Sequence, residues 1–301
     1  MKIGVLGPAG TFSEAAAELW LLSKAEKNEE GEEIKYYETI FGVSEGVLRG
    51  EVDCGIVPIE NSLEGSVGET LDVLSSEREN AGAAEGEGEE LRIVGEVLVP
   101  IKINLSLRTL PNLPNLPKNL AEIKTVVSHP HALAQCKQFL REQLRGAKIK
   151  SVDSTASAAK LAAKDEKGRT AALASEEAAR RYGLKIVAEN VQDKESVTRF
   201  VVLSSSSLAT ETAPTGKDKT SVLIYLKDRP GALYEVLGEF ARRGINLTKI
   251  ESRPSRRAMG DYMFHIDCEG HLDEEAVRAA LRGVEQRVAT LKILGTYPVA
   301  K

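Results

Sequence analysis

A threonine and an arginine stand next to each other where an apolar segment begins in the second half of the chain. Thr198 and Arg199 precede the run Phe200-Val-Val-Leu203, which is typical of a buried strand. The guanidinium of Arg199 can hold a carboxylate by two parallel hydrogen bonds, and the hydroxyl of Thr198 adds a rotatable donor one residue away. This pair suits a small substrate that carries a carboxylate and a hydroxyl. A solvated surface charge is the alternative for the arginine alone, so the hypothesis depends on the elements around the pair.

Polar groups also collect in other turns that directly follow strand-like segments, namely residues 7–14, 59–68, 128–131 and 153–157. Hydroxyl, carboxamide and backbone N–H groups at strand ends are where open α/β sheets bind ligands, and a helix N-terminus there favours an anion. A capped helix or an Asx turn without a ligand is the alternative at these turns. The candidate substrate-binding residues in these turns are Thr11, Asn61, Ser62, Gly65, Ser66, Ser154, Thr155 and Ala156; Phe200, directly after the Thr198-Arg199 pair, is a further candidate.

The composition excludes several classes of partner. The chain has 301 residues, of which 42% are apolar, enough for two ordinary domains. Its net charge of -5 implies no general affinity for nucleic acid or for an anionic membrane. Neither a signal-peptide core nor a long apolar run is present, so a cytoplasmic protein without a membrane partner is expected.

Metal and disulfide motifs are also missing from the sequence. Cys54, Cys136 and Cys268 are far apart and lack CxxC spacing, which favours reduced core thiols over disulfides or zinc. His129 and His131 would point to different faces at the start of a helix, so a metal pair is not expected. The sequence therefore predicts neither a cofactor nor a metal.

Strand and helix patterns alternate through residues 1–204 and indicate two α/β lobes with a ligand cleft between them. Lobe one is expected at about 1–100 and 190–204 and lobe two at about 101–189, so that the Thr198 strand crosses back between the lobes. The segment 77–90 is rich in Glu and Gly and predicts an exposed loop that can be shortened without loss of turnover. Residues 205–218, rich in small polar residues, are expected to be a linker.

Residues 219–301 have the pattern of a separate βαββαβ domain. Tyr262, Phe264, Ile266 and Cys268 alternate along one predicted strand and would share one face of a sheet. A domain of this size and pattern often senses a small ligand, although the fold alone does not prove it.

The motifs occur together and in the order seen in prephenate dehydratases. The chain resembles that family in Gly7-Pro-Ala-Gly-Thr-Phe-Ser13, Pro58-Ile-Glu-Asn-Ser62, Gly65-Ser-Val67, Ser128-His-Pro130, Ser154-Thr-Ala156 and Thr198-Arg-Phe200. Its C-terminal part resembles the ACT regulatory domain in Gly231-Ala-Leu233 and Asn246-Leu-Thr-Lys-Ile-Glu-Ser-Arg-Pro254. The resemblance covers nearly the whole chain.

The resemblance implies a catalytic domain with the two-lobed fold of type II periplasmic binding proteins. It also implies the conversion of prephenate to phenylpyruvate in phenylalanine biosynthesis, with no cofactor or metal, and inhibition by phenylalanine at ACT domains paired in a homodimer or homotetramer. Thr198 is then the expected donor to the departing hydroxyl, and Arg199 the expected ligand of a substrate carboxylate. The implied effector-binding residues are Gly231, Ala232, Leu233, Asn246, Leu247, Thr248, Glu251, Ser252 and Arg253.

Two residues depart from the family pattern. Ser196 stands where the family usually has Asn, so the turn that holds Thr198 is expected to be secured differently, and His131 stands where the family usually has Gln. Neither change alters the assignment. Two alternatives stay open: an arogenate dehydratase, whose substrate differs by an amino group, and a non-catalytic two-lobed binding protein that captures a ligand without turnover.

Overall fold

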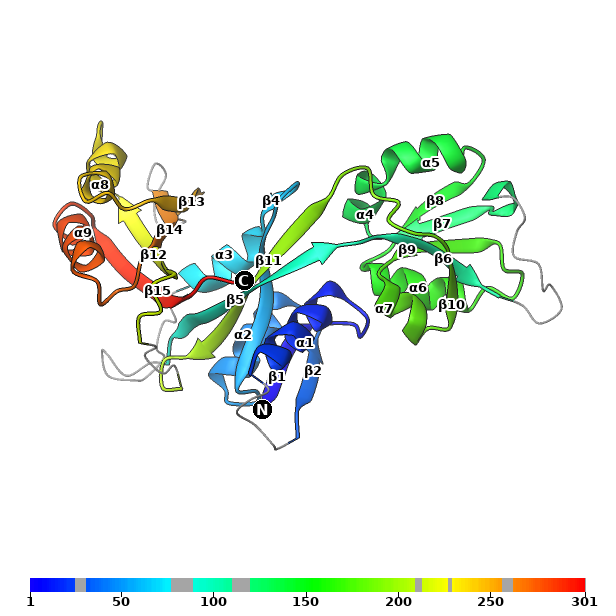
Figure 1. Cartoon of the computed structure of the whole chain (residues 1–301), viewed down its shortest axis with the longest axis horizontal. Coiled ribbons are helices and arrows are strands. Elements are labelled where there is room, and N and C mark those ends of the chain that lie inside the picture. The colour runs from blue at the N-terminus through cyan, green and yellow to red at the C-terminus, as the bar shows by residue number, and fades with distance from the viewer. Residues whose placement is uncertain are drawn as a thin grey trace.

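The computed structural model describes residues 1–24, 31–76, 89–109, 120–208, 213–226, 229–255 and 262–300. Most of the predicted acidic loop, residues 77–88, lies outside the described residues. The described chain forms three sheets in a row (Figure 1): lobe one in the middle, lobe two on one side of it and a C-terminal domain on the other. No described helix is both long and apolar enough to span a membrane.

Lobe one is a mixed sheet with the strand order β2-β1-β3-β11-β5, and β4 pairs with β3. β1, β2 and β3 are parallel, whereas β11 is antiparallel to both of its neighbours. Thr39 caps α2 by accepting a hydrogen bond from the Gly42 N–H at 2.9 Å. The elements of lobe one are β1 (Lys2–Leu6), α1 (Phe12–Lys24), β2 (Glu33–Tyr37), α2 (Ile40–Leu48), β3 (Cys54–Asn61), β4 (Gly65–Ser66), α3 (Gly68–Ser75), β5 (Leu91–Ile101) and β11 (Ser196–Ser205).

Lobe two has the strand order β10-β6-β9-β7-β8, with β7 parallel to both β8 and β9. Its alanine-rich helices pack closely on the sheet, and Ser154 and Ser175 cap two of them through their side-chain oxygens. The elements are β6 (Asn104–Arg108), the 3-10 turn η1 (Leu120–Glu122), β7 (Thr125–Ser128), α4 (Pro130–Gln135), α5 (Lys137–Gln143), β8 (Lys148–Ser151), α6 (Thr155–Ala163), β9 (Thr170–Ala174), α7 (Glu176–Arg181) and β10 (Leu184–Ala188).

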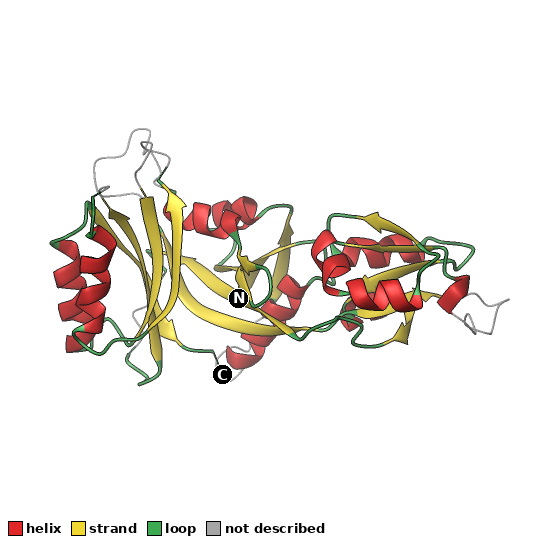
Figure 2. Ribbon diagram, turned by 90° about the horizontal axis from the view of Figure 1, so that it is seen from above, coloured by secondary structure: helices red, strands yellow, loops and turns green. Residues whose placement is uncertain are grey.

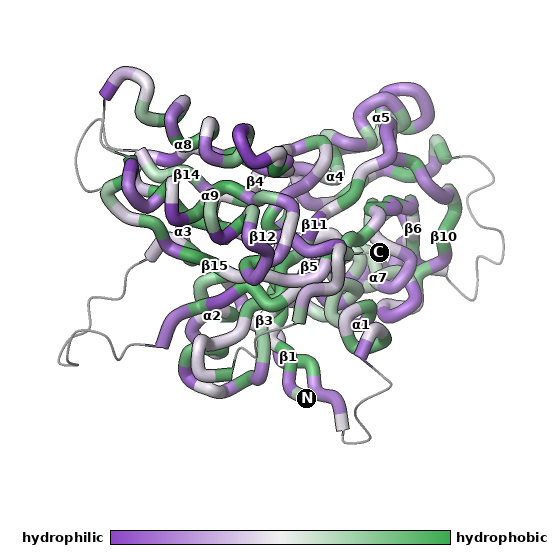
Figure 3. The backbone as a smooth tube through the Cα atoms, turned by 60° about the vertical axis from the view of Figure 1, so that its left-hand side comes forward, coloured by the Kyte–Doolittle hydropathy of each residue, from purple (hydrophilic) through white to green (hydrophobic). Residues whose placement is uncertain are grey.

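The C-terminal domain has the predicted βαββαβ order, and its sheet runs β13-β14-β12-β15. Both helices cover one face of this sheet (Figure 2), and green and purple alternate along them in Figure 3, as expected of helices with one buried face. The elements are β12 (Asp218–Leu226), α8 (Ala232–Ala241), β13 (Leu247–Pro254), β14 (Tyr262–Glu269), α9 (Glu275–Glu285) and β15 (Thr290–Pro298).

The second face of the C-terminal sheet is buried too, because it packs on lobe one. All nine residues of β12 are buried, and Leu223 and Tyr297 share one apolar cluster with Val201 and Leu203 of β11. Gly295 of β15 crosses so close to β5 that a Cβ there would overlap the Ile93 carbonyl. The C-terminal domain is therefore joined to lobe one by a continuous core.

Candidate active site

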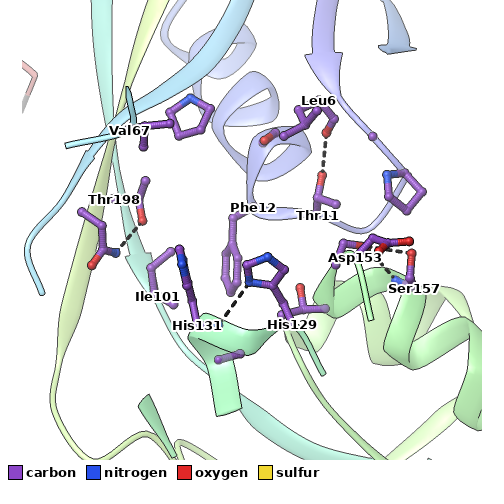
Figure 4. Close-up of a pocket in the computed structure, with 18 of the residues that line it drawn as sticks. Leu6, Thr11, Phe12, Val67, Ile101, His129, His131, Asp153, Ser157 and Thr198 are labelled. Atoms are coloured by element: carbon purple, nitrogen blue, oxygen red, sulfur yellow. Dashed lines mark hydrogen bonds between the residues drawn. The ribbon is translucent and has the colours of Figure 1, made fainter. Parts of the chain in front are cut away.

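A cavity of about 870 Å³ lies between the two lobes, at the ends of β1, β3, β7 and β8 where the sequence placed its polar turns. In Figure 4, Thr198 is on one side of the cavity and Asp153 and Ser157 are on the other, with Phe12, His129 and His131 between them. Of the predicted substrate-binding residues, Thr11, Asn61, Ser154, Thr155 and Phe200 line the cavity, as does Thr198.

The hydroxyl of Thr198 is oriented by Asn61. The side-chain oxygen of Asn61 accepts the N–H groups of Leu63 and Glu64 at 2.9 and 3.0 Å, so the amide nitrogen must be the group that faces Thr198. That nitrogen donates to Thr198 Oγ1 at 2.9 Å. With a lone pair of the hydroxyl occupied in this way, its proton is left to be donated into the cavity.

Asn61 lies in a turn at the end of a strand and not at a helix N-terminus. It is the last residue of β3, and the following helix α3 begins only at Gly68. Its role in orienting Thr198 is therefore one that sequence reasoning missed. The Asx turn that the sequence offered as an alternative for residues 59–68 is present, since the Asn61 oxygen accepts from the backbone N–H groups of Leu63 and Glu64. Such a turn fixes the oxygen and leaves the amide nitrogen available to a second partner.

The strand segment around Thr198 is held by Ser62 and has one hydroxyl without a partner. Ser62 exchanges hydrogen bonds with Val197: its N–H donates to the Val197 carbonyl at 2.9 Å, and its Oγ accepts the Val197 N–H at 3.0 Å. The buried Oγ of Ser196 has no hydrogen-bond partner in the part of the chain that the structure describes. The turn next to Thr198 is thus secured by Asn61 and Ser62, without the side chain of Ser196.

Lobe two contributes helix starts and a pair of histidines. Ser154 caps α6 by accepting the Ser157 N–H at 2.9 Å, so the N-terminal end of this helix faces the cavity. His129 caps α4, and its ring lies edge-on to that of His131 with 4.8 Å between the ring centres. Burial, followed by the charge of His131, lowers the pKa of His129.

The charges around the cavity differ from those expected. Among the described residues that line it there is no Lys or Arg, whereas Glu38, Glu64 and Asp153 do line it. A bound anion would therefore rely on helix N-termini, hydroxyl groups and the two histidines. Within the described chain there is no cluster of three or more His, Cys, Asp or Glu residues that could hold a metal ion.

The prediction that Arg199 binds a substrate carboxylate is wrong. Successive residues of a strand face opposite sides, so Thr198 points into the cavity and Arg199 points away from it, toward the C-terminal domain. There its nitrogens donate to Glu96 at 2.7 Å, Asp267 at 2.6 Å and Tyr297 at 2.9 Å. Burial disfavours the charge, but these three partners outweigh it and raise the pKa of Arg199.

Other predicted site residues also lie outside the cavity lining. Ala156 is fully buried within lobe two. Gly65 and Ser66 form β4, and Ser66 Oγ donates to Glu251 of the C-terminal domain at 3.0 Å. Ser62 contacts Val197 rather than the cavity. These groups support the site or join the domains.

A buried glutamate that the sequence did not single out links the two lobes beside the cavity. Glu14 of α1 accepts from the Gly10 N–H, from Tyr36 Oη at 2.5 Å and from Arg181 of lobe two at 2.7 Å. Burial, reinforced by Glu14, raises the pKa of Tyr36 to about 12. Gly10 has φ +88 and rests against Ala178, so the turn after β1 touches lobe two through its backbone.

The predicted effector residues occupy two regions of the C-terminal domain. Gly231 has φ +82 and precedes α8, and Leu233 and Leu247 flank the same apolar core. The Asn246 amide donates to Glu269 at 3.1 Å. Glu251 and Arg253 of β13 instead contact lobe one, where Arg253 pairs with Asp72 at 2.6 Å. The remaining predicted effector residues are Ala232, Thr248 and Ser252.

The two lobes, the hydroxyl in the cleft and the attached βαββαβ domain define a class of protein: a two-lobed ligand-cleft protein with a C-terminal βαββαβ domain. Sequence profiles agree, because that of prephenate dehydratase matches residues 3–208 and that of the ACT domain matches residues 220–286. The chain therefore belongs to the prephenate dehydratase family.

Curated relatives and a solved structure support this placement. A bifunctional chorismate mutase/prephenate dehydratase from Aquifex aeolicus is 40% identical over all of this chain and 74% of its own length. An arogenate dehydratase/prephenate dehydratase from Arabidopsis thaliana is 39% identical over 99% of this chain and 73% of its length. The crystal structure of a prephenate dehydratase from Arthrobacter aurescens in complex with L-Phe matches with a TM-score of 0.82 and 36% identity, over 99% of this chain and 90% of that one.

Proposed function

We propose that the cleft catalyses the decarboxylative dehydration of prephenate to phenylpyruvate in L-phenylalanine biosynthesis. The chain is then a carbon–oxygen lyase, in line with the family to which it belongs. The observation that carries the proposal is the hydroxyl of Thr198, which Asn61 orients so that its proton can be donated into a cavity without lysine or arginine among its described lining residues.

The reaction needs one well-placed donor and little else. The bond from the ring to its carboxylate breaks and releases CO2, and the electron pair enters the ring. The C–O bond at the opposite ring carbon breaks, and the departing hydroxide takes up a proton to become water. Because a threonine hydroxyl is a weak acid, Thr198 donates a hydrogen bond as charge builds on the leaving oxygen instead of transferring a proton beforehand.

The rest of the cavity binds the substrate by shape and by helix ends. Phe12, Ile101 and Phe200 provide apolar walls for the ring. The starts of α1 and α6, at Thr11 on lobe one and at Ser154 and Thr155 on lobe two, supply backbone N–H groups for the carboxylates. The hydroxyls of Thr11 and Ser154 already donate to the Leu6 carbonyl and to Ser157 Oγ. The ring of the substrate contacts both lobes, which explains why residues of both lobes line the cavity.

Arogenate is the second candidate substrate, and the charges of the cavity favour it. Arogenate carries an ammonium group, which Glu38, Glu64 or Asp153 would attract, and prephenate does not. Measuring kcat/KM for both substrates at equal ionic strength distinguishes the two. A higher value for arogenate would make the chain chiefly an arogenate dehydratase.

Regulation by phenylalanine is part of the same proposal. The ACT profile match and the L-Phe complex of the Arthrobacter enzyme support a site for this amino acid on the C-terminal domain. The exposed Ile250 and Tyr262 on the strands β13 and β14 support pairing of two such domains in a homo-oligomer. We place the catalytic unit at 1–204, the linker at 205–218 and the regulatory domain at 219–301.

The location is proposed to be cytoplasmic. Cys54, Cys136 and Cys268 are all buried and free, which is usual in a reducing compartment.

The experiment is turnover of prephenate by the wild-type chain and by two variants at Thr198. Thr198→Val keeps the shape of the side chain but removes the donor, so kcat should fall roughly 10²-fold with a smaller change in KM. Thr198→Ser keeps the hydroxyl and should retain much more turnover than the valine variant. If the valine variant works within a few-fold of wild type, Thr198 does not take part in the chemistry. If the wild-type chain binds prephenate and turns over neither prephenate nor arogenate, it is a binding protein.

A further inference from the structure

A buried cluster of charged and hydroxyl groups joins the strand of Thr198 to the ACT domain. Its centre is Arg199 of β11, which donates to Glu96 of β5 at 2.7 Å. On the ACT side Arg199 donates to Asp267 of β14 at 2.6 Å and to Tyr297 of β15 at 2.9 Å. Lys219 of β12 completes the cluster by donating to both oxygens of Glu96, at 3.0 and 2.8 Å.

These groups hold one another in a single arrangement. Ser221 Oγ lies 2.6 Å from both Asp267 and Tyr297 Oη, so the ACT partners of Arg199 are themselves fixed. Two cations and two carboxylates balance, and all four are at most 8% exposed. Removing one partner would leave an unpaired buried charge, so the cluster resists any arrangement in which the two domains are displaced.

Arg199, the centre of the cluster, directly follows Thr198 in the sequence. Thr198 and Arg199 are consecutive in β11 and face opposite sides of it, so a shift of the Arg199 backbone moves Thr198 as well. The pairing of β11 with β3 changes register at this point, since Arg199 is opposite Glu60 whereas Phe200 is opposite Pro58. The hydroxyl of Thr198 therefore lies next to the place where the ladder is least regular.

The segment expected to bind the effector is connected to the same arginine. Lys249 of β13 pairs in register with Asp267, the ACT partner of Arg199. Its amino group lies 3.5 Å from Glu60, and Glu60 lies 3.6 Å from Arg199. Lys249 also donates to Ser66 of β4 at 2.5 Å. A movement of β13 thus reaches Arg199 through two short connections.

We propose that Arg199 is a positioning residue through which the ACT domain sets the placement of the Thr198 hydroxyl. Asp267 and Tyr297 hold the guanidinium from the ACT side and Glu96 holds it from lobe one. A rearrangement of the ACT sheet on binding an amino acid changes the first two contacts, and Thr198 moves out of line with the departing hydroxyl. The inference that an amino acid inhibits turnover through Arg199 rests on the proposed function. The inference that Arg199 holds the β11 strand and Thr198 in place does not.

The test compares two tyrosine-to-phenylalanine variants of the same interface. Tyr297→Phe removes one acceptor of Arg199 and keeps the packed ring. Tyr225→Phe is the matched control, because Tyr225 is a buried ACT tyrosine whose hydroxyl donates to lobe one at another element, to the Ser75 carbonyl of α3 at 3.2 Å. Both variants are made in the wild-type chain and in Thr198→Val, and kcat, KM and the maximal inhibition by phenylalanine are measured.

We expect Tyr297→Phe to lower kcat roughly two- to tenfold, the effect of one lost hydrogen bond, with little change in KM. In the Thr198→Val background, Tyr297→Phe should not lower kcat any further, because its effect depends on the placement of the Thr198 hydroxyl. Maximal inhibition by phenylalanine should be weaker in Tyr297→Phe, while calorimetry shows unchanged phenylalanine binding. Tyr225→Phe should behave as wild type in all three respects.

Equal effects of the two variants, or a loss of kcat by Tyr297→Phe that is the same with and without Thr198, would overturn the inference. A wild-type chain that does not turn over prephenate contradicts the proposed function instead. In that case hydrogen exchange of the peptide spanning residues 196–200 decides the positioning role. It should be faster in Tyr297→Phe than in Tyr225→Phe, and equal rates would show that the cluster does not hold this strand.

Discussion

The face of the ACT sheet that packs on lobe one carries a histidine that should make this interface sensitive to acid. His265 of β14 is only 3% exposed, and its Nε2 has no hydrogen-bond partner in the described part of the chain. Asp72 of α3, across the interface, lies close enough to influence it, as do Lys249, Arg253 and Asp267 of the ACT sheet.

The sign and size of the effect follow from its pKa. Burial, helped by Lys249 and Arg253 and opposed by Asp267 and Asp72, lowers the pKa of His265 to about 4. An unfolded histidine has a pKa of about 6.5. Between these values the unfolded chain binds a proton that the folded chain does not, so the free energy of unfolding falls as the pH falls. At about 1.4 kcal/mol per pKa unit, the loss between pH 6.5 and 4 amounts to about 3 kcal/mol.

The measurement is the free energy of unfolding in urea from pH 7.5 to 4.5, for the wild type and for His265→Gln. The variant lacks the titrating group, so its stability should fall less steeply below pH 6.5. The control is His131→Gln, which removes an exposed histidine in the cleft and should follow the wild-type profile. If wild type and His265→Gln lose stability in parallel over this range, His265 is not held neutral by burial and the reasoning fails.

Two further changes test the geometry of the cleft. Asn61→Ala removes the donor that orients Thr198, so kcat should fall roughly 10- to 100-fold; a normal kcat would mean that the hydroxyl is oriented by something else. Gly10→Ala would place a Cβ 3.2 Å from the backbone of Ala178 in lobe two and should raise KM by separating the lobes. The control is Gly50→Ala, because Gly50 also has a positive φ but has open space around it. Equal KM values for the two alanine variants would show that contact at Gly10 does not matter.

The order of strands and helices followed well from the sequence because each element carries a local signal. An apolar segment followed by a glycine-rich turn indicates β1 and the start of the next helix. Ser154 and Ser175 indicate two further helix starts, because their side-chain oxygens can cap a helix. The βαββαβ order of the C-terminal part was confirmed for the same reason. Such signals lie within a few residues of one another, and no distant contact is needed to interpret them.

The contact between the ACT sheet and lobe one could not be predicted in this way. The prediction that Tyr262, Phe264, Ile266 and Cys268 share one face of β14 said nothing of the other face. There Met263, His265 and Asp267 are buried. A face that mixes methionine, histidine and aspartate has the composition of a solvated surface. Only the contact with Arg199 of β11 shows that Asp267 on this face is paired inside the protein.

The error over Arg199 had a signal that the sequence did contain. Thr198 and Arg199 were assigned to one site because they are adjacent, but both were also placed at the start of a strand, where adjacent residues face opposite sides. Either the threonine or the arginine could therefore face the substrate, and the two could not do so together. The apolar residues that follow show the same division, since Phe200 and Val202 join the core of the lobes while Val201 and Leu203 pack against the ACT domain. The Thr-Arg-Phe motif thus divides between the two faces of one strand: one face presents a hydrogen-bond donor to the cleft, and the other packs against the ACT domain.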